Sequence, residues 1–214
     1  MKRNYFLIAG LLIVATLIAT AVVYPDLPSR VPMHWNWRGE VNRYGEKWEV
    51  FLTPALMASL VILFAVMPWI SPKRFEVDTF QSTYLYIMLV MAAFIAYLHV
   101  LILWSAISKT FNLHRALLGA VFLLLALLGN VLGKVRRNFF IGVRTPWTLA
   151  NEKVWDATHR FAAKVFVLAG LLGLLSMAVT SGPIIGLVIF AAAALAAVIY
   201  SLVYYKRLER HDQL

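Results

Sequence analysis

The sequence contains no cysteine and few charged residues. Without cysteine, the chain has no disulfide framework, no thiolate metal site and no cysteine nucleophile. Only 14% of its 214 residues are charged, and 62% are hydrophobic. Soluble domains contain about 25% charged and about 45–50% apolar residues, so this composition excludes a water-soluble globular protein.

Aspartate and glutamate are absent from six apolar runs, each about 20 residues long. Because an α-helix rises about 1.5 Å per residue, such a run crosses the ~30 Å hydrocarbon core of a bilayer. We therefore predict an all-α, multi-pass protein of the cell membrane with six transmembrane helices. The predicted spans are Tyr5–Tyr24, Leu52–Ile70, Thr83–Ile107, Leu113–Leu132, Phe161–Thr180 and Ile184–Tyr205.

The first run has a second interpretation as a cleaved signal peptide, because Ala19-Thr20-Ala21 resembles a small-residue cleavage site. The apolar region of a signal peptide is about 7–15 residues long, which is shorter than this run and favours a retained span. In both cases the segment that follows lies outside the cell.

The last two spans are separated only by Ser181-Gly182-Pro183, which is typical of a tight turn. We expect these spans to form an antiparallel helical hairpin. Small residues in both spans, among them Gly170, Gly173 and Gly186, should let helix backbones approach closely.

The basic residues indicate the orientation. The net charge is +10, and most Lys and Arg residues fall in alternate loops, with the densest group between Lys134 and Lys164. Because positively charged loops stay in the cytoplasm, both termini and the loop at 133–160 are predicted to be cytoplasmic. Basic residues in a membrane protein first meet anionic lipid, so membrane lipid is a predicted partner and direct nucleic-acid binding is not.

The segment 25–51, predicted to be extracytoplasmic, is rich in proline, glycine and large aromatic residues. Proline and glycine prevent a continuous helix, so we expect an ordered cap or a short hairpin. His34 could act as a base, a metal ligand or a hydrogen-bond partner, but the segment has no second histidine and no paired acids. We therefore predict a structural histidine and no metal site. The aromatic side chains that must pack on the membrane interface or on a ligand are Trp35, Trp37, Tyr44 and Trp48.

The segment 130–164 alternates basic and aromatic residues. Thr145 can cap a helix that has Pro146 at its first position. Residues at near-helical spacing then predict an interfacial amphipathic helix with one face formed by Trp147, Val154, Trp155, Thr158, Phe161 and Ala162. This helix either lies among the lipid headgroups or docks a cytoplasmic partner, and both interpretations stay open. The basic residues that would hold it at the headgroups are Arg136, Arg137, Arg144 and Arg160.

Both polar segments resemble known motifs. The first is similar to the signature of a small uncharacterised domain that precedes SdpI proteins, and the second to the SdpI core signature. The matching residues of the first are Pro32, His34, Trp35, Asn36, Gly39, Asn42 and Tyr44. Those of the second are Asn130, Gly133, Asn138, Arg144, Thr145, Pro146, Trp147, Thr148, Trp155 and His159. The resemblance implies one membrane domain with an N-terminal region at 1–70 and an SdpI core at 83–205.

The resemblance also implies a function in immunity and signalling. The founding member of this broad family protects a sporulating bacterium from its own secreted toxic peptide and, once it has detected that peptide, holds a transcriptional repressor at the membrane. The first motif would then bind the peptide and the second would face the repressor, with no cofactor.

A small transporter or channel, or a membrane-embedded peptidase, is the alternative. No Ser-His-Asp set, paired intramembrane aspartates or His-Glu-x-x-His motif supports an enzyme, so no catalytic residue is predicted. His99 keeps these alternatives open, because an ionisable group inside a span is a functional candidate. A neutral His99 ring bonded to a neighbouring helix is the structural interpretation.

Overall fold

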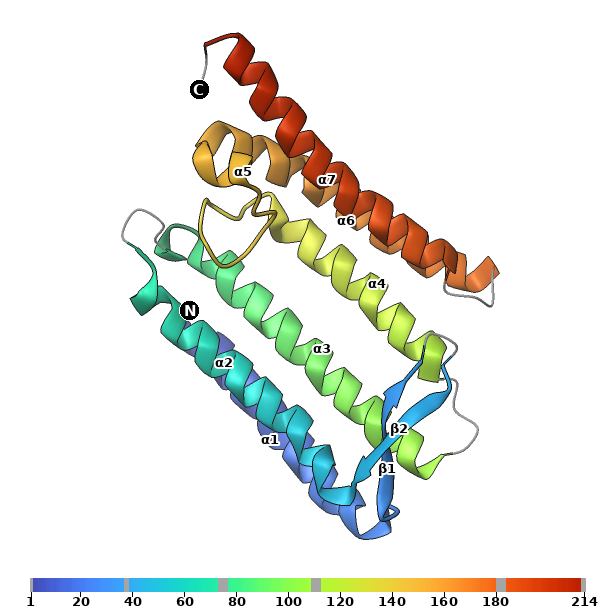
Figure 1. Cartoon of the computed structure of the whole chain (residues 1–214). Helices are drawn as coiled ribbons and strands as arrows, with labels where there is room; N and C mark the ends of the chain where they lie inside the picture. The colour runs from blue at the N-terminus through green and yellow to red at the C-terminus, as the bar shows by residue number, and fades with distance from the viewer. Residues whose placement is uncertain (1, 37–38, 73–76, 109–112, 180–183, 213–214) are drawn as a thin grey trace. The chain divides into compact units, whose positions relative to one another are not determined.

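The structure is a computed structural model that describes residues 2–36, 39–72, 77–108, 113–179 and 184–212 (Figure 1). Among these residues, six helices are long and apolar enough to cross a membrane, which confirms the six predicted spans. They are α1 (Lys2–Val23), α2 (Leu52–Ile70), α3 (Gln81–Ile107), α4 (Leu113–Leu132), α6 (Glu152–Val179) and α7 (Ile184–Arg210). The chain is therefore a multi-pass membrane protein.

The chain forms two compact units. Unit 1 comprises residues 1–65 and 88–120, and unit 2 comprises residues 66–87 and 121–214. Helices α2, α3 and α4 contribute residues to both units. The short elements are η1 (Tyr24–Asp26), η2 (Lys47–Phe51), η4 (Val77–Phe80), α5 (Pro146–Ala150) and the strands β1 (Arg30–Trp35) and β2 (Val41–Glu46).

Unit 1 contains the hairpin, which we define as residues 30–46. Strands β1 and β2 pair antiparallel, so the ordered first loop that the prolines and glycines indicated is confirmed. Val31 of β1 is fully buried in a cluster with Leu27, Val50 and Leu103. Leu103 lies near the end of α3, so burial of this apolar cluster fixes the base of the hairpin to the helices of unit 1.

Unit 2 contains the antiparallel helix pair α6 and α7 (Figure 1). The rings of Phe161 and Tyr200 stack with centroids 4.3 Å apart, and Ala169 packs with Ala193 further along the pair. These contacts run in opposite directions along the two helices, which confirms the predicted helical hairpin. The predicted turn at 181–183 lies outside the described residues.

The predicted close approach of helices in unit 2 is confirmed. A Cβ atom added to Gly170 would lie 2.6 Å from the backbone oxygen of Phe122. Gly173 and Gly186 both leave space that the Phe122 ring occupies. Small residues on α6 and α7 therefore admit an aromatic side chain and a backbone of α4, as expected where helices pack in lipid.

The prediction of a single interfacial helix from Pro146 to Ala162 is wrong, because this stretch is divided between two helices. Helix α5 ends at Ala150, and Asn151 is extended at φ −138° and ψ 130°. The Asn151 side-chain oxygen accepts the backbone N–H of Val154 at 3.2 Å, which caps the start of α6. An asparagine side chain competes with the backbone for helix hydrogen bonds, so the helix restarts here. Helix α6 then continues directly from Glu152 into the fifth span.

Candidate functional site

The hairpin is closed by polar bonds between its strands. His34 Nδ1 lies 2.6 Å from Asn42 Oδ1, so an N–H of His34 donates to the amide oxygen. The strand register is irregular on both sides of His34, between Pro32 and Trp35. Such an irregularity re-aims side chains locally. His34 and Asn42 are both exposed, while Pro32 is buried at the base of the hairpin.

The turn of the hairpin is organised by Asn36. Its side-chain oxygen accepts the backbone N–H of Glu40 at 3.0 Å, and its side-chain N–H donates to the Glu40 carboxylate at 2.8 Å. Gly39 has φ +82° and donates its N–H to the Asn36 backbone oxygen. A positive φ favours glycine, so the glycine of the motif is required by the turn.

The hairpin also presents large aromatic side chains. Tyr44 is 51% exposed and Trp48, in the following η2 turn, is 57% exposed. Trp35 is half-buried, and Trp37 lies outside the described residues. Exposed aromatic side chains next to polar side chains are typical of a binding surface or of contact with the membrane interface.

Sequence reasoning missed two contacts of the hairpin. The carboxylate of Glu49 accepts from Arg43 at 2.6 Å and from the backbone N–H of Glu46 at 2.8 Å, which ties β2 to η2. A Cβ atom added to Gly39 would lie 2.7 Å from Cβ of His114, so the turn rests against the start of α4 within unit 1. The second contact joins residues far apart in the chain, and no local pattern signals it.

Most residues of the second motif lie in the α4–α6 segment, which we define as residues 133–151. Asn138 is fully buried near its start. Its side-chain oxygen accepts the backbone N–H groups of Phe140 and Ile141, both at 2.7 Å. Its side-chain N–H groups donate to the backbone oxygens of Arg136 and Ile141 at 2.8 and 3.0 Å. One asparagine therefore satisfies the backbone of a whole turn, which accounts for its burial.

His159 fastens the α4–α6 segment to α6. The backbone N–H of Val143 donates to His159 Nε2 at 3.0 Å, so this nitrogen is an acceptor and the ring proton is on Nδ1. Nδ1 donates to the Trp155 backbone oxygen at 2.8 Å. A Cβ atom on Gly142, which has φ +122°, would overlap His159 Nε2. Glycine at 142 is therefore what lets the segment reach the ring.

Trp155 completes this attachment. The indole is fully buried, and its Nε1–H donates to the Val135 backbone oxygen at 2.7 Å. Its ring stacks on the His159 ring with centroids 4.0 Å apart. Trp155 and His159 therefore form one buried pair that holds the segment at Val135 and at Val143.

Thr145 and Thr148 cap helix α5. Each side chain bonds to the other's backbone N–H, at 3.2 and 2.9 Å, and Pro146 follows at the first helical position. This arrangement confirms the predicted cap. The Thr145 hydroxyl also lies 3.0 Å from that of Ser201, which ties α5 to α7 and was not predicted.

The other residues of the second motif lie around this cluster. Arg144 is exposed and donates to the Phe139 backbone oxygen. Trp147 is half-buried in α5. Asn130 and Gly133 are exposed at the end of α4. The predicted residues thus separate into a buried cluster and an exposed margin.

His99 is fully buried in α3 of unit 1. Its Nε2 lies 2.7 Å from the Thr20 hydroxyl of α1. The Thr20 hydroxyl also lies 2.8 Å from the Thr16 backbone oxygen, to which it donates. Because that hydroxyl has a single proton, His99 Nε2–H is the donor to Thr20 in this arrangement. His99 thus bonds a neighbouring helix, as its structural interpretation expected.

Comparison with known proteins defines the class of this molecule. Residues 134–205 match the model of the SdpI/YfhL protein family, and residues 11–58 match a domain of unknown function (DUF1648). The first match covers α5, α6 and most of α7, and the second contains the hairpin. These matches confirm the resemblance of both polar segments: residues 134–205 are similar to the SdpI/YfhL family, and residues 11–58 to the domain of unknown function.

One curated relative is similar along its full length. The chain is 26% identical over 211 residues to Immunity protein SdpI of Bacillus subtilis (strain 168), covering 97% of this chain and 98% of that protein. No solved structure matches the chain.

Proposed function

We propose that this chain is a membrane immunity protein that protects its host from a secreted toxic peptide. The observation that carries the proposal is the near-complete coverage between this chain and Immunity protein SdpI. Protection by binding, without catalysis, is part of the proposal. The described residues contain no group of three or more metal-ligating side chains, so we propose no metal-dependent step.

The hairpin is the proposed contact surface for the peptide. Its polar side chains His34 and Asn42 are exposed and fixed by their mutual bond, beside the exposed ring of Tyr44. Fixed aromatic and polar side chains bind with little loss of conformational entropy. The charge distribution favours an outer location for this surface, because most basic loops belong to the opposite side.

The experiment is a protection assay in the strain that carries the gene. A deletion strain is exposed to the secreted peptides of the intact strain and complemented with wild-type or variant protein. Trp35→Ala and His34→Ala should lower the tolerated dose about 30-fold, as expected for loss of a binding hot spot. Trp69→Ala is the matched control, since Trp69 is an exposed tryptophan at the end of α2. Full protection by Trp35→Ala and His34→Ala at normal expression would contradict the contact surface.

The orientation has a separate test. The absence of cysteine allows single cysteines to be placed at Ser29, before β1, and at Ser71, after α2. In intact cells, Ser29→Cys should react with an impermeant thiol reagent and Ser71→Cys should not. Labelling of Ser71→Cys alone would reverse the proposed orientation.

A second part of the proposal concerns the α4–α6 segment, which would hold a transcriptional repressor on the cytoplasmic side. Lys153 is exposed directly after this segment and is a suitable site to disturb such a contact. Lys153→Glu should remove one DNA-binding protein from the membrane fraction, measured by mass spectrometry, and should leave protection intact. If Lys153→Glu left the protein content of the membrane fraction unchanged, the proposal that the segment holds a repressor would be contradicted, and only the immunity function would remain proposed.

A further inference from the structure

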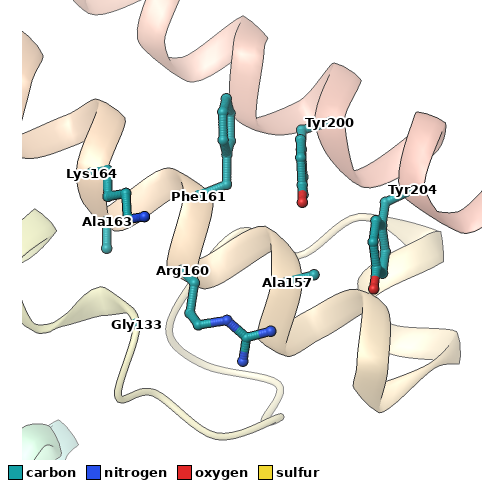
Figure 2. A pocket seen from close by; sticks show the side chains of 8 residues that line it. All are labelled: Gly133, Ala157, Arg160, Phe161, Ala163, Lys164, Tyr200 and Tyr204. Atoms are coloured by element: carbon teal, nitrogen blue, oxygen red, sulfur yellow. The ribbon is translucent and has the colours of Figure 1, made fainter.

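Helices α6 and α7 enclose an apolar groove of about 470 Å³, which we call the α6/α7 groove (Figure 2). Three rings form a stacked row along it, with centroids 4.3 Å apart between Phe161 and Tyr200 and 5.8 Å between Tyr200 and Tyr204. Ala157 and Ala163 line the rest of the apolar wall. The groove therefore has the dimensions and the surface of a site for an aliphatic chain.

Two basic residues border the same groove. Arg160 and Lys164 project from α6, one turn apart, as Figure 2 shows. Both side chains are exposed. Within the described part of the chain, neither has an ion pair or a side-chain hydrogen bond. An apolar groove thus ends at two cations whose charge the protein does not neutralise.

Arg160 and Gly133 also line a second, polar cavity of about 700 Å³ in the same unit. Of its two acids, Asp156 pairs with Arg136 at 3.6 Å, and Asp78 accepts a hydrogen bond from the neutral Gln81 amide at 2.6 Å and keeps its negative charge. Lys134 is a further cation of this cavity without an ion pair among the described residues. The basic residues that line the two cavities outnumber these two acids, so the junction of the polar cavity and the apolar groove carries a net positive charge.

We propose that this junction binds one anionic phospholipid, with its phosphate between Arg160, Lys164 and Lys134 and one acyl chain in the α6/α7 groove. Guanidinium and ammonium groups are the usual partners of phosphate oxygens. An aliphatic chain against stacked rings removes apolar surface from water or from loosely packed lipid. The inference is independent of the peptide-binding hairpin, since every residue that carries it belongs to unit 2.

The test uses the full-length protein in nanodiscs that contain equal amounts of phosphatidylglycerol and phosphatidylcholine. Native mass spectrometry after transfer to detergent should show one retained phosphatidylglycerol on the wild-type protein. Arg160→Gln with Lys164→Gln should reduce its retention about 30-fold, from roughly fivefold per basic residue near a phosphate. Arg3→Gln with Arg210→Gln is the matched control, because it removes the same charge at exposed helix ends.

Two further variants separate lipid binding from misfolding. Arg160→Lys with Lys164→Arg keeps the charges and should retain the lipid. Gly133→Leu should reduce retention without loss of charge, because a Cβ at this position points to Arg160 and Ala163 at 3.6–3.8 Å, where the two cavities meet. Equal losses in the Arg160/Lys164 variant and the matched control would overturn the proposal. Displacement of the lipid by inorganic phosphate alone would also overturn it, because the ligand would then be a free phosphate.

Discussion

The hairpin and the α4–α6 segment use the same kinds of residue in opposite ways. In the hairpin, both bonds are exposed to solvent: His34 joins the two strands, and Asn36 closes the turn between them. Asn138 of the α4–α6 segment and His159 of the adjoining α6 are fully buried and satisfy backbone groups of the segment. When one partner of a buried hydrogen bond is removed, the other partner stays buried without a bond, and stability falls by its full desolvation penalty. When an exposed partner is removed, water takes its place. The hairpin is therefore suited to recognition and the segment to fixed structure.

The largest expected difference is between two tryptophans that adjoin these regions, Trp155 in α6 and Trp48 in η2. Trp155→Ala removes a fully buried ring with a hydrogen bond and should lower the free energy of unfolding by about 3–5 kcal/mol. Trp48→Ala removes a ring that is 57% exposed and should cost about 1 kcal/mol or less. Thermal unfolding of the purified protein in detergent measures both. Equal losses would remove the distinction between the regions.

A smaller difference is expected between two asparagines. Asn138→Ala leaves buried backbone N–H groups of the α4–α6 segment without an acceptor and should cost about 2–3 kcal/mol. Asn42→Ala breaks an exposed bond to His34 and should cost well under 1 kcal/mol of stability. Limited proteolysis within residues 133–151 would show the first effect locally. The segment should be cleaved faster in Asn138→Ala and at the wild-type rate in Asn42→Ala.

The smallest expected effect concerns the buried contact between Thr20 and His99 in unit 1, which we compare with the buried contacts of His159 in unit 2. Thr20→Val removes the hydroxyl that lies 2.7 Å from His99 Nε2. Hydrogen bonds between membrane helices average about 0.6 kcal/mol, so the stability loss should be of this size. Thr16→Val changes a hydroxyl of the same helix that bonds only within that helix, and it serves as the control. If Thr20→Val alone lowered the free energy of unfolding by several kcal/mol, the bond of His99 would be as important for stability as those of His159.

The sequence predicted the six spans well because span length is set by bilayer thickness. The predicted and observed bounds agree at Leu52–Ile70 and Leu113–Leu132. The start of α6 was missed by several residues because its first turns, from Glu152 to Arg160, are polar and do not extend the apolar run. The length of an apolar run predicts the part of a helix that lies in lipid. It does not predict the polar turns that extend beyond the lipid.

The candidate sites were predicted in part. Motif positions such as Asn138, Thr145 and His159 were identified, and the cap at Thr145 follows from local residue order. The bond from Thr145 to Ser201 and the contact of Gly39 with His114 depend on how separate helices pack. Residues that meet only through tertiary packing leave no periodic or local signal in one sequence.

Helix α6 is longer than the hydrocarbon core of the bilayer is thick, and its length links the α4–α6 segment to the tilt of the helix. Its 28 residues form one continuous helix, about 42 Å long. The hydrocarbon core is only ~30 Å thick, so about two turns extend beyond it. Trp155 and His159 lie in the first turns of α6 and form hydrogen bonds to Val135 and Val143 of the segment. A rigid tilt of α6 by about 10° within the bilayer would therefore move its far end about 7 Å sideways, together with the segment attached to it.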